Sequence, residues 1–331
     1  MKLCSRCVLP ENFPTVHIDS EGICNYCRAY QNEQYKDEDK NRYLEKFKRL
    51  IQEKAGSAMY DIIVAYSGGK DSTYTLELLK NKYGLCVLAF TFDNGFVSQR
   101  AFDNMRRVVD NLGIDHMIFK ADFSMLKKVF ISSIHTNPYS KKSLERASTI
   151  CTTCMLFVKA AILKAAIEKK IPFIGYGWSP GQAPIQSSVI RMSPAFLRAA
   201  QNSACESLQG VAGEIPKRYF LNDHDYAEGD KFPYNVHPLA FEYYDEEHIY
   251  EHIKNLGWLP PDDTDPNSTN CILNAFAIHI HKDQFKFHPY AFEISGLVRA
   301  GIMQRSEGIN RLYAPDNMRI VEEVRKRLSA E

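Results

Sequence analysis

The segment Ala65 to Thr73 reads AYSGGKDST and follows the apolar run Tyr60 to Val64. Glycines let a backbone approach an anion without obstruction by a Cβ atom. Where such a turn joins a strand to a helix, backbone N–H groups and the positive end of the helix dipole point at one place. The hydroxyls and the lysine add donors and charge. The segment therefore predicts a loop that binds the phosphates of ATP.

The common phosphate loop, GxxxxGK followed by Ser or Thr, is not present, because no glycine lies five residues before Gly69. An alternative interpretation is a helix-capping turn, since serine and aspartate are frequent at such positions. The location of the segment between a predicted strand and a predicted helix favours phosphate binding.

Four cysteines near the start of the chain form two pairs, CSRC and CNYC, with sixteen residues between the pairs. This spacing is typical of a tetrahedral zinc site, with free thiols or an iron site as alternatives. Four thiolates close the coordination shell, so the site would be structural and would stabilise a segment with almost no core. The predicted zinc ligands are Cys4, Cys7, Cys24 and Cys27.

Three further cysteines form a second set. Cys151 and Cys154 occur as CTTC at the start of a predicted helix, and Cys271 lies in the polar segment DPNSTNC. The helix N-terminus is expected to lower the pKa of the two CTTC thiols. The set is interpreted as a redox pair with a third thiol, or as three ligands of an iron–sulfur cluster with one open iron. The alternative is that Cys154 packs in its helix and Cys271 has no role.

Strands alternate with helices from about residue 59 to residue 177, which predicts that one sheet positions these motifs. Strands are expected at about 61–66, 85–95, 116–122 and 171–177, and helices at 72–84, 99–113 and 155–170. The order predicts an α/β fold with a doubly wound parallel sheet that is covered on both faces.

The chain is expected to contain four parts: a zinc knuckle at 1–30, a linker helix at 31–58, a nucleotide-binding domain at 59–200, and a mainly helical region at 201–331 for substrate binding or oligomerisation. The 41 basic and 40 acidic side chains nearly cancel, which argues against strong attraction of a large nucleic acid. No secretion signal and no stretch of about 18 apolar residues are recognised. A cytoplasmic protein with no membrane partner is therefore expected.

The AYSGGKDST segment resembles the SGGxDS signature of the PP-loop ATP pyrophosphatases, the adenine nucleotide alpha-hydrolase superfamily, which cleave ATP between its α- and β-phosphates. TFDNG at Thr91 to Gly95 lies where the family's second strand meets adenine and ribose, and GYG at Gly175 to Gly177 matches a turn of the relatives. The resemblance covers about residues 59–184. It implies a HUP-like fold with Mg²⁺ bridging the phosphates and catalytic roles for Lys70 and Asp71. It also implies nucleotide contacts from Ala65, Ser67, Gly68, Gly69, Asp71, Ser72, Phe92, Asp93 and Gly175.

The layout CTTCMLFVKAAILKAA followed by FIGYG resembles the iron–sulfur-dependent tRNA thiolation enzymes of the same superfamily. By that resemblance, Cys151, Cys154 and Cys271 would be catalytic and would bind a [4Fe–4S] cluster whose free iron receives a sulfide. The N-terminal cysteine segment instead resembles the opening of the N-acetyl-sugar amidotransferases, which replace a carbonyl with an amidine by using ammonia. Those relatives carry SGGVDS-like loops and lack the CTTC pair, so Lys70 and the pair favour sulfur.

Three hypotheses follow: an ATP-dependent sulfurtransferase, a sugar amidotransferase, and a non-catalytic nucleotide-binding scaffold. The expected cofactors are ATP, Mg²⁺ and Zn²⁺, with the [4Fe–4S] cluster in the sulfurtransferase. The expected partners are a small-molecule, nucleoside or tRNA acceptor and a protein that donates sulfur or ammonia. The chain is also expected to form a homo-oligomer, through the knuckle or the terminal helices.

Overall fold

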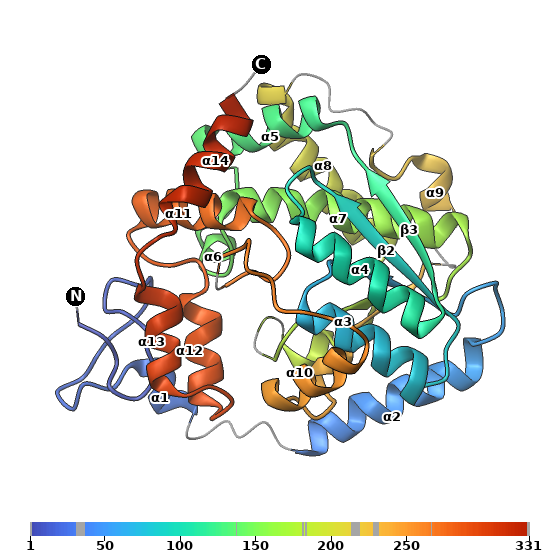
Figure 1. The fold of residues 1–331 in the computed structure, drawn as a ribbon, viewed down its shortest axis with the longest axis horizontal. Helices are drawn as coiled ribbons and strands as arrows, with labels where there is room; N and C mark the ends of the chain where they lie inside the picture. The colour runs from blue at the N-terminus through green and yellow to red at the C-terminus, as the bar shows by residue number, and fades with distance from the viewer. Residues whose placement is uncertain are drawn as a thin grey trace.

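The computed structural model describes residues 2–30, 37–136, 138–180, 182, 184–212, 219–227, 232–265 and 267–329. Its centre is a six-stranded sheet with the order β3-β2-β1-β4-β6-β5 (Figure 1). Only β5, at one edge, is antiparallel to its neighbour. The strands are β1 (Ile62–Ala65), β2 (Val87–Asp93), β3 (Asp115–Lys120), β4 (Phe173–Tyr176), β5 (Val189–Arg191) and β6 (Tyr234–Val236).

Helices cover the sheet, and further helices lie to one side of it (Figure 1). The α-helices are α1 (Asn25–Tyr30), α2 (Asp37–Lys54), α3 (Lys70–Glu77), α4 (Gln99–Leu112), α5 (Phe123–Thr136), α6 (Lys141–Leu144), α7 (Thr149–Glu168), α8 (Pro194–Ala212), α9 (Asp223–Ala227), α10 (Glu246–Asn255), α11 (Leu273–Phe285), α12 (Ala291–Arg299), α13 (Arg305–Tyr313) and α14 (Met318–Ser329). A π-helical turn, η1 (Leu78–Lys82), extends α3.

The sheet is apolar on both faces, as predicted for a parallel sheet between two helical layers. Ile62 and Val64 of β1 face a core shared with α2, α3, α4 and α10. Ile63 faces the opposite core, which takes its other residues mainly from α5, α7, α11 and α14. The predicted doubly wound α/β fold, consistent with a HUP-like domain, is confirmed.

The central strand β1 pairs with β2 on one side and with β4 on the other. The chain leaves β1 toward β2 and leaves β4 toward the opposite edge, so the connections diverge at the carboxyl ends of these two strands. Such a switch point opens a crevice where α/β proteins bind ligands. The segment after β1 is the predicted phosphate loop.

Strands β5 and β6 were not recognised in the sequence, because three residues are too few to establish a period of two. Strand β6 lies beyond residue 200 and pairs with β4, so the sheet takes strands from both sides of the proposed boundary at that residue. The boundary itself falls inside α8.

The N-terminal knuckle packs against the C-terminal part of the chain, beside α12 and α13 (Figure 1). Their shared core contains Val8, Leu9 and Phe13 from the knuckle, with Ile294 and Leu312 from the two helices. The named residues of the two parts lie at least 281 positions apart in sequence, from Phe13 to Ile294. The knuckle thus obtains from distant helices the apolar core that its own segment lacks.

Helix α7 is long and apolar enough to cross a membrane by length and composition. The expectation that no stretch met this condition was therefore wrong for α7. In the fold this helix packs against α5, α11 and the strands β1, β2 and β4. Its apolar composition follows from this position on one face of the sheet.

Candidate functional site

The predicted phosphate loop leaves the end of β1 and turns into α3. Gly68 has a φ of +77°, and a Cβ atom there would lie 2.8 Å from the carbonyl oxygen of Ala101. The carbonyl oxygen of Gly68 accepts a hydrogen bond from Nε1 of the buried Trp258 at 2.8 Å. Glycine is therefore required at this position, and these contacts hold the turn against α4 and the segment after α10.

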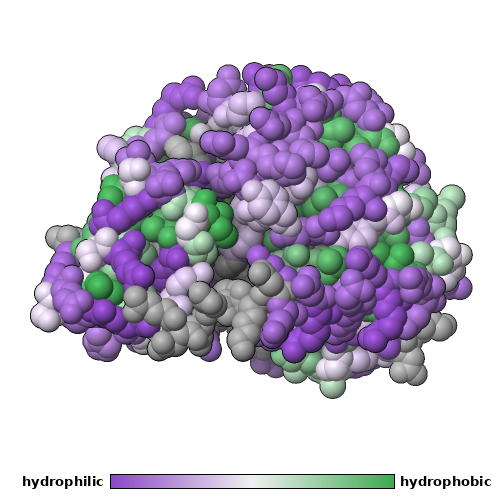
Figure 2. Space-filling view, turned by 90° about the horizontal axis from the view of Figure 1, so that it is seen from below, coloured by the Kyte–Doolittle hydropathy of each residue, from purple (hydrophilic) through white to green (hydrophobic). Residues whose placement is uncertain are grey.

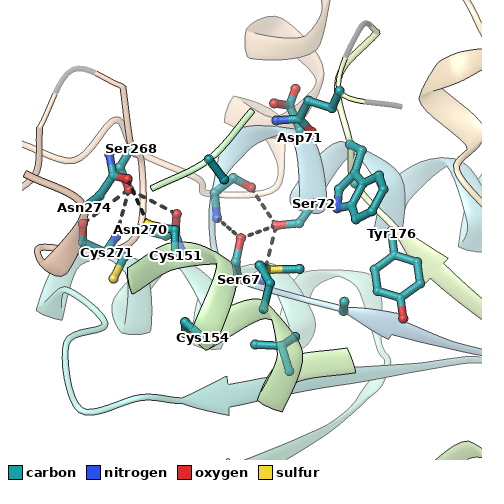
Figure 3. A pocket seen from close by; sticks show the side chains of 18 of the residues that line it. Ser67, Asp71, Ser72, Cys151, Cys154, Tyr176, Ser268, Asn270, Cys271 and Asn274 are labelled. Atoms are coloured by element: carbon teal, nitrogen blue, oxygen red, sulfur yellow. Dashed lines mark hydrogen bonds between the residues drawn. The ribbon is translucent and has the colours of Figure 1, made fainter. Parts of the chain in front are cut away.

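Serine hydroxyls close the loop (Figure 3). The Oγ atoms of Ser67 and Ser72 lie 3.1 Å apart, and the backbone N–H of Ser67 donates to Ser72 Oγ. The backbone N–H of Lys70, the first residue of α3, donates to Thr269 Oγ1 at 3.3 Å. A hydroxyl from a distant loop thus contacts the N-terminus of α3, which is a favourable position for an anion.

A pocket of about 900 Å³ opens over this loop. Seen from below, the surface is hollowed between a smaller and a larger part of the molecule, and apolar side chains gather beside the hollow (Figure 2). Ten of the residues predicted to have a role line the pocket: Ala65, Ser67, Gly69, Lys70, Asp71, Ser72, Phe92, Cys151, Cys154 and Cys271. The residues predicted to bind the nucleotide and those predicted to carry the sulfur chemistry therefore line one cavity.

Apart from the knuckle cysteines, three predicted site residues do not line this pocket. Besides Gly68, they are Asp93, whose Oδ1 accepts from the N–H of Gly95 at 2.8 Å, and Gly175, which packs beneath Leu79. Gly177 lines the pocket instead, and a Cβ atom there would lie 2.6 Å from Cα of Ser72. Within the GYG motif, the second glycine is the one that allows close approach to the phosphate loop.

Lys70 is buried in a network of opposite charge. Its Nζ lies 2.9 Å from Asp71 Oδ1 and 3.1 Å from Glu246 Oε1, and donates to Tyr244 Oη at 2.8 Å. Burial lowers the pKa of Lys70, but the negative charges of Asp71 and Glu246 outweigh it and raise the pKa above its ordinary value. Glu246 also pairs with Arg311 of α13 at 2.9 Å. The loop lysine is thus a fixed positive charge at neutral pH.

Side-chain amides contact all three pocket cysteines. The Nδ2 atom of Asn94 donates to Cys154 Sγ at 3.4 Å and to Cys271 Sγ at 3.6 Å. Cys151 Sγ donates to Asn274 Oδ1 at 3.7 Å. Asn94 and Asn274 were not singled out in the sequence, although Asn94 belongs to the quoted TFDNG motif, and both line the pocket. The cysteines come from α7 and from the loop before α11, which the fold brings together (Figure 3).

The prediction that the helix N-terminus lowers the pKa of the two CTTC thiols is wrong. Burial raises the pKa of Cys151 to about 12 and also raises the pKa of Cys154 and Cys271. At the N-terminus of α7, Ser148 Oγ accepts from the N–H of Cys151 at 3.1 Å. Desolvation disfavours the thiolate form of these cysteines more than the helix dipole favours it.

These three sulfurs fit a cluster better than a single ion. Among the described residues, only the N-terminal cysteines form a group whose ligand atoms all lie within 4.8 Å of one another. A cluster of several iron atoms holds its thiolates farther apart than one ion does. Three cysteines that line an open pocket, two of which accept hydrogen bonds from Asn94, are a suitable donor set for an iron–sulfur cluster with one open iron.

The N-terminal cysteines have the geometry of a single-ion site. Cys4 Sγ lies 3.8 Å from Cys27 Sγ, and Cys7 Sγ lies 3.8 Å from Cys24 Sγ. Four sulfurs at the usual distance from zinc in a tetrahedron lie about 3.8 Å apart. The backbone N–H of Leu9 donates to Cys7 Sγ at 3.5 Å, and hydrogen bonds from Cys24 and Cys27 lower the pKa of the Cys7 thiol. The group fits a zinc knuckle.

Comparisons with known proteins place these features in context. No protein-family model matches the chain. An uncharacterized protein of Methanocaldococcus jannaschii is 24% identical over 289 residues, which cover 86% of this chain and 85% of that protein. The tRNA-specific 2-thiouridylase MnmA of Halothermothrix orenii is 30% identical over 129 residues, which cover 35% of this chain and 34% of that protein. The comparisons are consistent with the PP-loop ATP pyrophosphatase superfamily.

Solved structures overlap with the chain at low scores. The U34-tRNA thiolase NcsA from Methanococcus maripaludis, solved with its [4Fe-4S] cluster, has 17% sequence identity and a TM-score of 0.36, with 97% of this chain and 96% of that chain covered. The NMN synthetase from Francisella tularensis has 15% identity and a TM-score of 0.37, with 84% and 98% covered. At these scores the overlaps carry no argument about the site, whose chemistry follows from the pocket itself.

Proposed function

We propose that the protein uses ATP to activate a carbonyl group of an acceptor and then replaces the carbonyl oxygen with sulfur. One observation carries this proposal: the SGGKDS loop and the cysteines Cys151, Cys154 and Cys271 line the same pocket. Its volume of about 900 Å³ lies near the upper end of the range for small-molecule sites, about 300–1,000 Å³. ATP and the reacting end of an acceptor can therefore occupy it together.

The activation step follows from the loop. The acceptor oxygen attacks the α-phosphorus of ATP, and the bond from this phosphorus to the bridging oxygen of the β-phosphate breaks, which releases pyrophosphate. Negative charge develops on the departing diphosphate, so the hydroxyls of Ser67 and Ser72, the first amides of α3 and the charge of Lys70 stabilise it. Asp71 lines the pocket beside Lys70 and would hold Mg²⁺ against the phosphates.

The sulfur step follows from the cysteines. A [4Fe–4S] cluster held by three thiolates would leave one iron open, where a sulfide from the donor could be held as the nucleophile. Cys151, Cys154 and Cys271 would hold this cluster, and Asn94 would donate hydrogen bonds to two of their sulfurs. Replacement of the adenylated oxygen releases it with AMP, so one ATP is converted to AMP and pyrophosphate for each sulfur transferred.

The acceptor and the sulfur donor complete the proposal. The thiouridylase with 30% identity over part of the chain makes a tRNA uridine one candidate acceptor, beside a free nucleoside and a small metabolite. The knuckle would carry zinc in a structural role. A separate protein would supply sulfide, since the three cysteines serve as ligands.

Anaerobic purification with iron, zinc and sulfide analysis tests the assignment. In Cys151→Ala we expect the iron to be lost and the zinc to remain, because the two cysteine sites are separate. Cys86→Ala is the matched control, since Cys86 is exposed and lies outside both groups. Equal iron in wild type and Cys151→Ala would remove the cluster from the proposal.

The second candidate, an N-acetyl-sugar amidotransferase, is favoured by the resemblance of the CSRC and CNYC segment to those enzymes. It would use ammonia from a glutaminase partner and would not need the pocket cysteines. Mass spectrometry of the product separates the two reactions, because sulfur replaces oxygen in one and nitrogen replaces it in the other. A non-catalytic scaffold would bind ATP without pyrophosphate release and would keep its cellular role in Asp71→Ala.

A further inference from the structure

Helix α13 is bound to the backbone of the zinc knuckle at both of its ends. At its start, Arg305 donates from Nε to the carbonyl oxygen of Cys7 and from Nη2 to that of Cys4, both at 3.1 Å. At its end, Tyr313 Oη donates to the carbonyl oxygen of Val8 at 2.8 Å. The residues that surround the metal position therefore hold this helix along its length.

The knuckle and α13 also pack closely at Gly308. A Cβ atom at Gly308 would lie 3.0 Å from Val298 Cγ2 and 3.3 Å from both Ile294 Cγ2 and Val8 Cγ2. Glycine at this point lets α12, α13 and the knuckle approach one another more closely than larger residues would. Movement of the knuckle would therefore remove both packing and hydrogen bonds from α13.

The same helix holds the ATP side of the pocket. Arg311 Nη2 lies 2.9 Å from Glu246 Oε2, and the other oxygen of Glu246 lies 3.1 Å from Lys70 Nζ in the phosphate loop. The carbonyl oxygen of Arg311 accepts from Asn267 Nδ2 at 2.8 Å. Asn267 starts the loop in which Thr269 contacts the N–H of Lys70. Arg311 thus contacts the phosphate loop through two separate routes.

The two ends of this connection are close and rigidly joined. Arg305 and Arg311 are six residues apart on one α-helix, which corresponds to about 9 Å along its axis. Without a metal, a four-thiol knuckle of this size loses most of its folding free energy. The carbonyl acceptors of Arg305 and Tyr313 would then no longer be held in place.

We infer that α13 positions the phosphate loop from the knuckle, so that the metal-loaded knuckle is needed for full affinity for ATP. Arg305, Gly308 and Arg311 are the positioning residues, and they act through Glu246 on Lys70. The inference relies on the proposed function only in taking the SGGKDS loop to bind ATP. The knuckle thereby gains a role in ATP binding. Its position in the sequence, far from the phosphate loop, does not indicate such a role.

The test measures binding of α,β-methylene-ATP with Mg²⁺ by titration calorimetry, because this analogue is not cleaved between its α- and β-phosphates. Cys24→Ser removes a knuckle ligand and is expected to weaken binding about ten-fold, within the usual range of coupling between two sites. Arg311→Gln should weaken binding to a similar extent with zinc retained, and Arg311→Lys should recover part of the loss. Arg325→Gln is the control, since the pair of Arg325 with Glu322 on α14 is exposed.

The double variant Cys24→Ser/Arg311→Gln decides whether the knuckle acts through Arg311. If α13 carries the effect, the double variant should bind the analogue with about the same affinity as whichever single variant binds it less tightly. The inference would be overturned if the two fold-losses in affinity multiplied in the double variant, or if Cys24→Ser bound the analogue as tightly as the wild type. If Cys24→Ser does not fold, Arg305→Gln keeps all four ligands and should weaken nucleotide binding at unchanged zinc content; unchanged affinity there would also overturn it.

The two proposals fail in different ways. If the wild type does not bind the analogue, the proposed function fails at its first step. If the wild type binds the analogue and releases pyrophosphate from ATP, but binding does not depend on the knuckle, only the coupling through α13 is wrong. Loss of sulfur transfer in the pocket-cysteine variants has no bearing on this measurement.

Discussion

The two cysteine sites of this molecule differ in how their ligands are brought together. The knuckle uses two CxxC pairs close in sequence, and its sulfurs lie within 4.8 Å of one another. The pocket takes two cysteines from α7 and a third from a loop more than a hundred residues later. All four knuckle cysteines are buried, whereas the three pocket cysteines are partly exposed to the cavity. The first group is closed and buried, whereas the second lines an open pocket.

This difference shows how one chain separates structural from reactive sulfur. In the knuckle, backbone N–H groups and Arg299 contact the sulfurs, and four ligands leave no free coordination position. In the pocket, the amides of Asn94 and Asn274 contact the sulfurs. Under the proposed function, three ligands would leave one position for chemistry next to the phosphate loop. The same residue type would then serve stability in one place and reaction in the other.

The largest expected effect is in the open site. Cys271→Ser should abolish sulfur transfer, roughly a thousand-fold or more, as when a member of a catalytic group is removed. Its free energy of unfolding should change by only about 1 kcal/mol, because the side chain is partly exposed. Product analysis and thermal unfolding of the same preparation check both parts. If Cys271→Ser retained sulfur transfer, the pocket cysteines would not be the reactive group.

The closed site should give the opposite result. Cys27→Ser should release the metal and unfold residues 1–30, since structural zinc contributes about 10 kcal/mol or more to small domains. Zinc analysis and limited proteolysis measure this outcome. Cys86→Ser is the matched control. A variant that loses zinc but keeps its knuckle resistant to protease would show that the distant helices alone hold this segment.

Acid should destabilise the sheet through the partly buried His116 of β3. Burial lowers the pKa of His116 on β3 to about 4, below its ordinary value of about 6.5. A depressed folded-state pKa stabilises the fold above pH 6.5 and loses this contribution as the pH falls toward 4. The loss is about 3 kcal/mol. In urea unfolding across this range, His116→Gln should show a shallower fall than the wild type; parallel curves would assign the acid sensitivity elsewhere.

The smallest expected effect concerns the amide beside the pocket sulfurs. Asn94→Ala removes hydrogen bonds to Cys154 and Cys271, which stabilise the more negative, reduced form of a cluster. The reduction potential of the purified protein should fall by several tens of millivolts, since 59 mV corresponds to a factor of ten for one electron. Asn104→Ala, at a buried asparagine of α4 that bonds Leu259, is the control. Equal shifts of the reduction potential in both variants would show that Asn94 acts only through packing.

Local features were predictable because neighbouring residues encode them. The CxxC spacing predicted the knuckle, and glycine and serine after an apolar run predicted the turn from β1 into α3. The apolar strands at Ile62–Ala65 and Val87–Asp93 predicted a sheet buried on both faces. These signals depend on spacing and conformational preference, which act over a few residues.

Other expectations failed where burial decided the result. The helix dipole predicted a lowered pKa for Cys151, but desolvation raises it. Gly175 was predicted to contact the nucleotide, yet it packs inside the sheet layer while Gly177 approaches Ser72. Gly175 lies inside β4, whereas Gly177 follows the end of that strand, at the edge of the sheet where α3 begins. Packing depth of this kind cannot be read from composition. The residue types in these motifs predicted the kind of chemistry, but the sequence did not predict how deeply each residue is buried.

The sequence by itself determined the four-cysteine group of the knuckle, the turn from β1 into α3 and the parallel sheet, because each is specified by residues close together in the chain. Only the tertiary structure brought Glu246, Arg311 and Asn94 to the pocket and set the knuckle against α13. These contacts join elements that are far apart in sequence, and no local spacing records them. Their pairing depends on how the helices pack on the sheet, which is settled by the shape and burial of the whole chain.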